Sequence, residues 1–217
     1  MAYPLTHLCV AYKINKDPRF LLGALAPDAI HYRRAFINAA MSGIGAAKKI
    51  THICPVSNEP WGWITENDKW INHVADFLKT HPPEPMYKGY AAHVLTDIYN
   101  NITIWQSFCE NHPKEAAKGY DSDYYNDMRH IDSRLFLEFP HVGEIFALLK
   151  KAVAFDIDNL VTAEEVTAIQ NNILYENYKD IEAPPPRDYA YVSFDETLEF
   201  IDRAAEFCEN AVQKIKH

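Results

Sequence analysis

The segment from Met86 to Glu110 carries the strongest helical pattern in the sequence, and it constrains the fold more than any other stretch. Within it, His93 and Asp97 are four residues apart, so a helix places both on one face with Cβ atoms about 6 Å apart. Such a pair can bind one metal ion, or the carboxylate can orient the ring of a metal-binding histidine. A single His–Asp pair with this spacing is more often a core histidine beside an acid than a metal site. Other residues of the chain must therefore decide between these two interpretations. The adjacent apolar stripe comprises Tyr90, Val94, Leu95, Ile98, Ile102 and Trp105.

The rest of the chain also predicts helices, and prolines separate them. The sequence has 13 prolines but only 7 glycines, and long alternating strands bounded by glycine turns are hard to find. Capping boxes mark helix starts at Thr162 and Ser193. We therefore predict a single all-α domain over residues 1–217, with residues 38–63 irregular. The expected helices are 6–13, 18–26, 29–36, 65–79, 86–110, 120–139, 142–155, 162–175 and one from 193 onward, with a stiff proline connector at 184–186.

Charge and composition argue against several classes of protein. The net charge is −9 with histidines neutral, which disfavours nucleic acid as a partner, because phosphate contacts require a basic surface. No apolar run approaches the ~20 residues of a membrane span, and the first residues lack a signal-peptide pattern. The four cysteines are far apart in the chain, so we expect reduced, mostly buried thiols and a cytoplasmic protein.

Three further positions add candidate metal ligands from separate elements. His7 falls in the first turn of the first expected helix. Asp28 follows a proline that ends a helix, where it either caps the next helix or serves as a ligand, since a carboxylate at a helix C-terminus is unfavourable without a nearby cation. His52 lies between apolar residues in a loop-like stretch, and a buried imidazole there needs a partner for each nitrogen. With His93 and Asp97, these residues form a set of imidazoles and carboxylates.

Other polar residues are weaker candidates. Asp127 and His130 are three residues apart in an acidic, tyrosine-rich stretch, where a solvated face is the more common interpretation, although both can serve a site. Glu138 and His141 have the spacing of a ligand pair, but the proline between them breaks the helix that such a pair requires. His73 fits the edge of the core better than a ligand position.

The ligand types in this set suit a catalytic zinc site. Zinc accepts imidazole and carboxylate ligands, and catalytic sites keep one position open for water. Two ions can share a bridging carboxylate and hold a phosphate between them, while one ion lowers the pKa of a water toward ~7. Structural zinc more usually recruits paired cysteines, which this sequence lacks.

Four pieces of the first half, in order, resemble the motifs of the zinc-dependent phospholipase C family, in particular its intracellular bacterial branch. Any one piece is a weak signal, but four in the same order are fairly specific. The second half resembles the same branch and supplies less of the site. The four pieces are Thr6-His7-Leu8, residues 20–28 (FLLGALAPD), Thr51-His52 and residues 89–97 (GYAAHVLTD).

The resemblance implies an all-helical fold of the phospholipase C and nuclease type, with a multi-zinc phosphodiester hydrolase site. It implies that His52, His93 and Asp97 bind one zinc ion. Asp97 is then expected to bridge to a second zinc that also binds His7. Asp28 is expected to be a ligand, or to act as the general base that orients the attacking water.

Two departures from the family pattern concern the remaining ligands. Secreted members use the amine of an N-terminal tryptophan, whereas this sequence has Met1 and Ala2 before the first motif. Those members also bind a third zinc through two histidines and a glutamate after the H-x-x-x-D helix, and residues 100–108 contain no histidine. His31 can substitute as a ligand or pair with Asp28 as an outer-shell group. We therefore expect two zinc ions, because a third zinc would lack its usual ligands. Residues later in the chain that could replace those ligands are His112, Asp127, His130 and His141.

Two classes of function follow from these residues. The first is a metal-dependent hydrolase of a phospholipid-like or small phosphodiester, and the second is a metal-stabilised helical binding protein without turnover. Other helical metalloenzymes are disfavoured, because the sequence has no His-Asp dipeptide, no two intact E-x-x-H helices and no H-E-x-x-H motif. Neither class predicts the oligomeric state.

Overall fold

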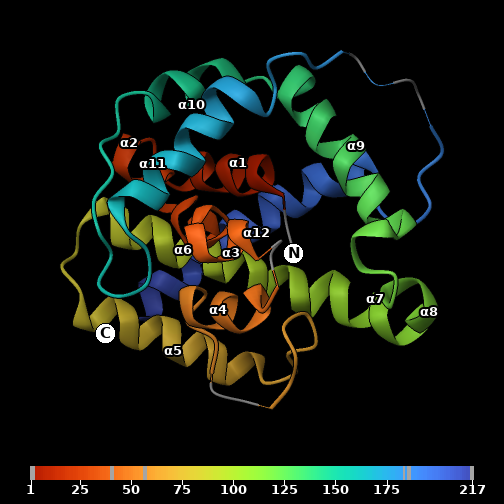
Figure 1. The fold of residues 1–217 in the computed structure, drawn as a ribbon, viewed down its shortest axis with the longest axis horizontal. Coiled ribbons are helices and arrows are strands. Elements are labelled where there is room, and N and C mark those ends of the chain that lie inside the picture. Colours follow the sequence, from red (N-terminus) through yellow and green to blue (C-terminus); the bar gives the residue numbers. More distant parts are fainter. Residues whose placement is uncertain (1–2, 40–41, 56–57, 183, 185–186, 216–217) are drawn as a thin grey trace.

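Helix α6 (Pro85–Asn100) lies at the centre of the structure, and most of its residues are buried. Four α-helices pack against it, α1 (Pro4–Ile14), α2 (Pro18–Gly23), α5 (Asn67–Thr80) and α12 (Phe194–Ile215), among the described residues (Figure 1). The computed structural model describes residues 3–39, 42–55, 58–182, 184 and 187–215. These residues form one helical body without a strand, which confirms the all-α prediction.

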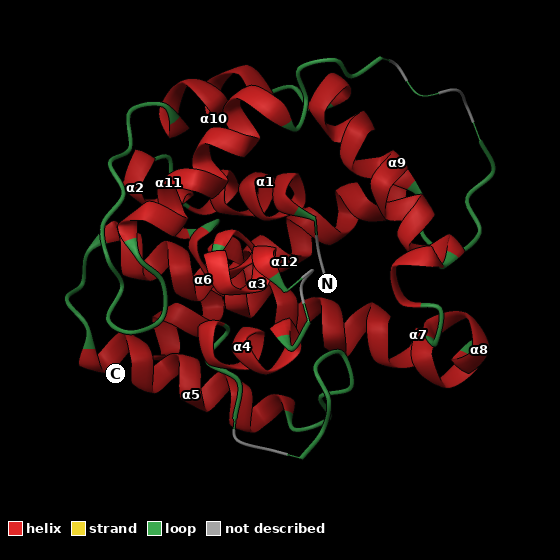
Figure 2. Ribbon diagram, in the orientation of Figure 1, coloured by secondary structure: helices red, strands yellow, loops and turns green. Residues whose placement is uncertain are grey.

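The other described elements surround this centre. Figure 2 shows that helix predominates over loop in the described structure. No helix in the described ranges combines the length and apolar character needed to cross a membrane. All four cysteines are free and three are buried, as expected. The other elements are α3 (Arg34–Asn38), α4 (Ile44–Thr51), α7 (Gln106–Asn111), α8 (Pro113–Ala116), α9 (Asp123–Glu138), α10 (Val142–Leu149) and α11 (Ala163–Asn171), the 3-10 helices η1 (Ala26–Tyr32) and η3 (Gly119–Asp121), and the π-helical turns η2 (Asn101–Trp105) and η4 (Asn172–Glu176).

Two glycines allow α2 and α6 to pack backbone against backbone. A Cβ atom on Gly89 would lie 2.0 Å from the carbonyl oxygen of Phe20, and one on Gly23 would lie 2.2 Å from the carbonyl oxygen of Met86. Any larger residue at either position would push the helices apart, because the clashing atoms belong to the backbone. The close approach brings the end of α2 next to His93, one turn along α6 from Gly89.

Two local predictions were wrong. Residues 38–63 are not irregular throughout, because α4 forms there and packs against η1. The glycines that suggested a loop lie at its start, where Gly43 has a φ of +77° at the N-cap. The expected helix over 29–36 is instead the end of η1 followed by α3. Extended backbone at Arg33 separates them, and its side chain binds Glu165 with Nε–Oε1 2.6 Å.

The predicted helix ends are mostly within a few residues of the observed ones. The capping box at Thr162 is present, and so are the reciprocal hydrogen bonds between Ser193 and Glu196. The first helix begins at Pro4 rather than after Thr6, and the predicted helix over 142–155 ends at Leu149. In the proline connector, residues 185 and 186 lie outside the described residues.

Candidate metal centre

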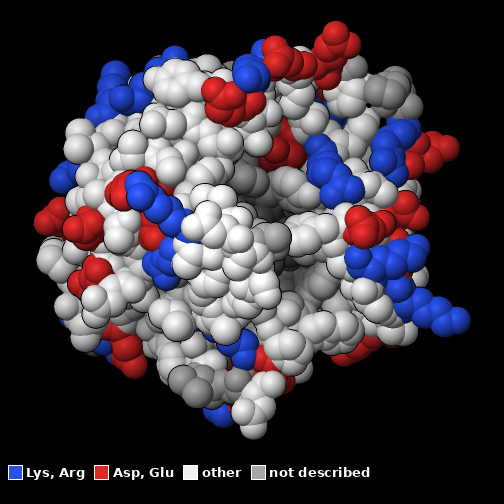
Figure 3. Space-filling model, viewed as in Figure 1, with Lys and Arg blue, Asp and Glu red and all other residues white. Residues whose placement is uncertain are grey.

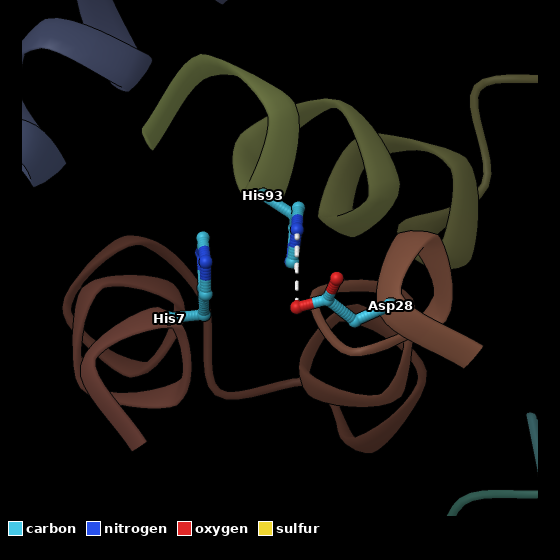
Figure 4. A group of neighbouring side chains, drawn as sticks. All are labelled: His7, Asp28 and His93. Carbon is cyan, nitrogen blue, oxygen red and sulfur yellow. Dashed lines mark ion pairs between the residues drawn. The ribbon is translucent and has the colours of Figure 1, made fainter. Parts of the chain in front are cut away.

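The structure brings the five predicted ligand residues together from four segments of the chain. Two come from α6, and the others from α1, η1 and the residue that follows α4. In Figure 4 three of the side chains point into a common space from three separate elements. Four of the five are buried, and the fifth, Asp28, has a side chain that is 16% exposed. The cluster consists of His7, Asp28, His52, His93 and Asp97.

Three of these residues, His52, His93 and Asp97, have ligand atoms close enough to hold one ion. The Nε2 atoms of His52 and His93 are 3.3 Å apart, and Asp97 Oδ2 lies 3.5 Å and 3.8 Å from them. Ligands in a tetrahedron at about 2.0–2.2 Å from zinc are about 3.3–3.6 Å from one another, so these three residues fit three of its four positions. Asp28 belongs to a second group with His7 and His93, and its Oδ1 lies 3.5 Å from His52 Nε2.

Backbone contacts determine which ring nitrogens face the cluster. His93 Nδ1 lies 2.7 Å from the carbonyl oxygen of Ala24, and His52 Nδ1 lies 3.0 Å from that of Lys48. The Thr51 hydroxyl, 3.0 Å from the same His52 nitrogen, donates to the Lys48 carbonyl. Because a carbonyl oxygen only accepts, each Nδ1 carries a proton and donates it. The Nε2 atoms of both rings then face each other and two carboxylates, an arrangement that favours a cation among them.

Burial and neighbouring charges set the protonation states of the cluster. Burial lowers the pKa of His93 to about 3, and the adjacent His7 acts in the same direction, so the ring is neutral at pH 7. Burial alone would raise the pKa of both acids. The histidines reverse this effect for Asp97, and Lys48 does so for Asp28, so both carboxyl pKa values lie below the usual range. The cluster thus contains charged carboxylates beside a neutral imidazole, as ligation requires.

Asp97 faces histidines on two sides. Its Oδ2 points to His52 and His93, whereas its Oδ1 lies 3.5 Å from His7 Nε2. The His7 ring stacks on the His93 ring at a centroid distance of 3.7 Å. Both His7 nitrogens are buried, and neither has a hydrogen-bond partner among the described residues. A carboxylate in this position can bridge two ions, one between His52 and His93 and one beside His7.

Lys48 belongs to the cluster, although the sequence did not indicate it. Its ammonium nitrogen lies 2.8 Å from Asp28 Oδ1 and 3.2 Å from His31 Nε2, and its side chain is only 5% exposed. Lys48 lies on α4, four residues before His52. This spacing brings two side chains together only on a helix, and the sequence did not predict a helix there. His31 lies at the outer edge of the cluster, with Nε2 3.6 Å from Asp28 Oδ1, in the paired position that the sequence allowed.

Asp127 and His130 make their contacts in another part of the molecule, the segment that leads into α12. Asp127 is fully buried, which contradicts the predicted solvated face, and its Oδ2 accepts three hydrogen bonds of 2.8–3.4 Å from the N–H groups of residues 190–192. Its Oδ1 lies 2.8 Å from the Arg187 guanidinium. His130 Nδ1 lies 3.0 Å from the Tyr189 hydroxyl. These contacts account for both residues without a metal ion.

The cluster opens into a cavity of about 260 Å³ on one side. Of the five cluster residues, only Asp28 lines it, together with His31 and Lys48. Tyr3 and Pro4 line it as well, and Figure 3 shows a hollow in the face that carries the start of α1. A larger cavity of about 450 Å³ lies between α7 and α12 and is lined by none of the five.

Comparisons with known proteins do not identify a family or a function for this chain. A scan against protein families, a search of curated proteins and a search of solved structures each returned no match. The chemistry of the cluster and of its cavity is therefore the basis for any function.

Proposed function

We propose that this protein is a zinc-dependent phosphodiester hydrolase of the phospholipase C type. The single observation that carries the proposal is the buried set of imidazole nitrogen and carboxylate oxygen atoms at zinc-ligand spacing, which reaches a cavity at Asp28. Membership of the zinc-dependent phospholipase C family and a cytoplasmic location belong to the same proposal.

The donor set favours zinc over other common cations. Three imidazoles and two carboxylates match the mixed nitrogen and oxygen ligands of catalytic zinc sites. Calcium and magnesium prefer sites built from oxygen atoms, and thiolate-rich sites suit structural zinc or iron–sulfur clusters. None of the described cysteines belongs to either candidate metal group.

Each cluster residue has a role in this proposal. His52, His93 and Asp97 would hold one ion, and His7 with Asp97 or Asp28 would hold a second. When bound, zinc polarises a phosphoryl oxygen and makes hydroxide available near neutral pH. Asp28 lines the cavity, so its carboxylate can orient a water there and accept its proton.

The number of ions is limited by the ligands. His93 directs only Nε2 into the cluster, because Nδ1 is bonded to the Ala24 carbonyl, so it serves one ion. The second ion then depends on His7 and a carboxylate oxygen of Asp97 or Asp28. The described residues form two candidate metal groups, and the proposal therefore uses two ions.

Local charge supports an anionic substrate. Two carboxylates beside one ammonium leave the metal-free cluster with a net negative charge, which a single divalent ion reverses. A phosphodiester anion is then attracted to the site, and its developing charge in the transition state is stabilised.

One observation favours the alternative, a metal-stabilised helical protein without turnover. The Lys48 ammonium pairs with Asp28 Oδ1 at 2.8 Å and so competes for the oxygen that a ligand or general base would use. A protein that keeps this pair when it binds metal would have a stable site but no base facing the cavity.

Metal analysis combined with a diesterase assay tests the proposal. We expect purified protein to contain one to two equivalents of zinc and to hydrolyse bis(4-nitrophenyl) phosphate. A chelator should abolish turnover, because zinc supplies both the Lewis acid and the hydroxide, and added zinc should restore it. Zinc without turnover would select the binding protein, and absence of stoichiometric zinc would reject both.

A further inference from the structure

We propose that the cavity beside Asp28 is the substrate pocket, that Lys48 binds the substrate phosphate, and that the tyrosine-rich wall selects a small, uncharged alcohol group. The inference rests on the proposed function, which it deepens by naming a phosphate-binding residue and a substrate class.

The surroundings of Lys48 suit the binding of an anionic ligand by its buried ammonium group. Its ammonium lies at the charged end of the cavity, where Asp28 and His31 take two of its three N–H donors. Its side chain is only 5% exposed, and its ammonium forms an ion pair with the Asp28 carboxylate at 2.8 Å. A charged ammonium this deeply buried requires a counter-charge.

Metal binding changes that balance. A cation held by the cluster beside Asp28 would offset the charge of the carboxylate that now compensates Lys48. The ammonium then faces added positive charge at the mouth of the site. A phosphate anion in the cavity restores compensation, because its oxygens can accept from Lys48 while they approach the cation.

The remaining described residues that line the cavity, here called the neutral wall, carry no charged side chain. The neutral wall consists of tyrosines and asparagines with a few apolar residues, and the π-helical turn η4 supplies part of it, a geometry that is frequent at functional sites. Burial and the nearby Asp28 raise the pKa of Tyr32 to about 12, so this phenol is neutral. The polar groups of this wall are Tyr3, Tyr32, Tyr120, Tyr125, Asn172 and Asn177.

Size and polarity together define the substrate class. The cavity of about 260 Å³ is smaller than the ~300–1,000 Å³ of typical pockets for drug-sized ligands. It has room for a phosphate and one compact group, but not for two acyl chains. Neutral hydroxyl and amide groups beside aromatic faces suit an aromatic or hydroxylated alcohol better than a charged one.

The test measures binding of inorganic phosphate to zinc-loaded protein by calorimetry, with zinc content determined on the same samples. Lys48→Met should keep its zinc and bind phosphate at least about tenfold more weakly, because it removes a charged hydrogen-bond donor. Lys49→Met is the matched control. It changes the adjacent lysine, whose ammonium contacts the Glu59 carbonyl, and should bind phosphate like the wild type.

The outcomes separate the two proposals. Wild-type protein without zinc overturns the proposed function and this inference with it. Zinc-loaded Lys48→Met with unchanged phosphate affinity overturns only the inference.

A second variant tests the pocket without altering Lys48, in case Lys48→Met does not fold. Asn172→Trp fills the cavity from the neutral wall, so it should retain zinc and inorganic phosphate binding. It should weaken competition by phenylphosphonate, which has one compact group and no ester bond to hydrolyse, against phosphate by about tenfold or more. Unchanged competition would place the substrate elsewhere.

Discussion

Two buried acidic sites in this protein have opposite chemistry. Around Asp127, three backbone N–H groups and the Arg187 guanidinium supply hydrogen-bond donors to one carboxylate. Around Asp97, imidazole nitrogens of His7, His52 and His93 lie close to the carboxylate. Burial is similar at both acids. The two acids therefore differ in the kind of partner that the fold gives them, backbone N–H groups and a guanidinium at Asp127 and metal-binding side chains at Asp97, and not in burial.

The largest expected effect comes from Asp97→Asn. The amide keeps the size of the side chain but is a poor bridging ligand, so the variant should lose at least half of its bound zinc. Its activity should fall by more than the about 10–100-fold that is typical when a partner behind a metal ligand is removed. Zinc content and diesterase rate are measured together. Full retention of zinc would show that Asp97 is as structural as Asp127.

Asp127→Asn should lower the stability of the fold without a loss of zinc. Loss of the charge weakens three backbone hydrogen bonds and leaves Arg187 without its carboxylate, so the free energy of unfolding should fall by about 3 kcal/mol. Denaturant unfolding measures this change, and zinc content provides the control. We expect zinc per folded molecule to match the wild type, and a loss of zinc would remove the distinction between the two sites.

A third buried acid, Asp132, should have a smaller and pH-dependent effect on the free energy of unfolding. Burial raises its pKa from 3.8 to about 6, although Tyr178 and the Leu5 N–H donate to it. The folded state therefore binds more protons than the unfolded state between these pH values. The contribution of Asp132 to stability is complete below pH 3.8 and decreases as the pH rises to about 6.

Asp132→Asn should remove this dependence. Because the amide carries no charge to bury, the variant should be more stable than the wild type at pH 7 by about 2 kcal/mol. The two proteins should converge near the acidic end of the window. Denaturant unfolding as a function of pH tests the prediction, and a constant difference across the window would contradict the raised pKa.

The sequence predicted the cluster residues better than it predicted their surroundings. His93 and Asp97 could be paired because a four-residue spacing on a helix brings side chains together whatever the rest of the fold does. Lys48 could not be included, because α4 has few apolar positions and begins between glycines. Asp127 was expected to be exposed because its partners come from a segment about sixty residues later in the chain.

Local pattern alone thus determined the helical class, the two capping boxes and the spacing of the His93–Asp97 pair, since each depends on residues within one or two turns of one another. Tertiary structure alone decided that side chains from four separate segments meet. It also decided that the Ala24 carbonyl orients the His93 ring with Nε2 toward the cluster, and that Lys48 lines the cavity. Those features depend on contacts between segments far apart in the chain, such as the glycine-mediated approach of α2 to α6, which no local spacing encodes.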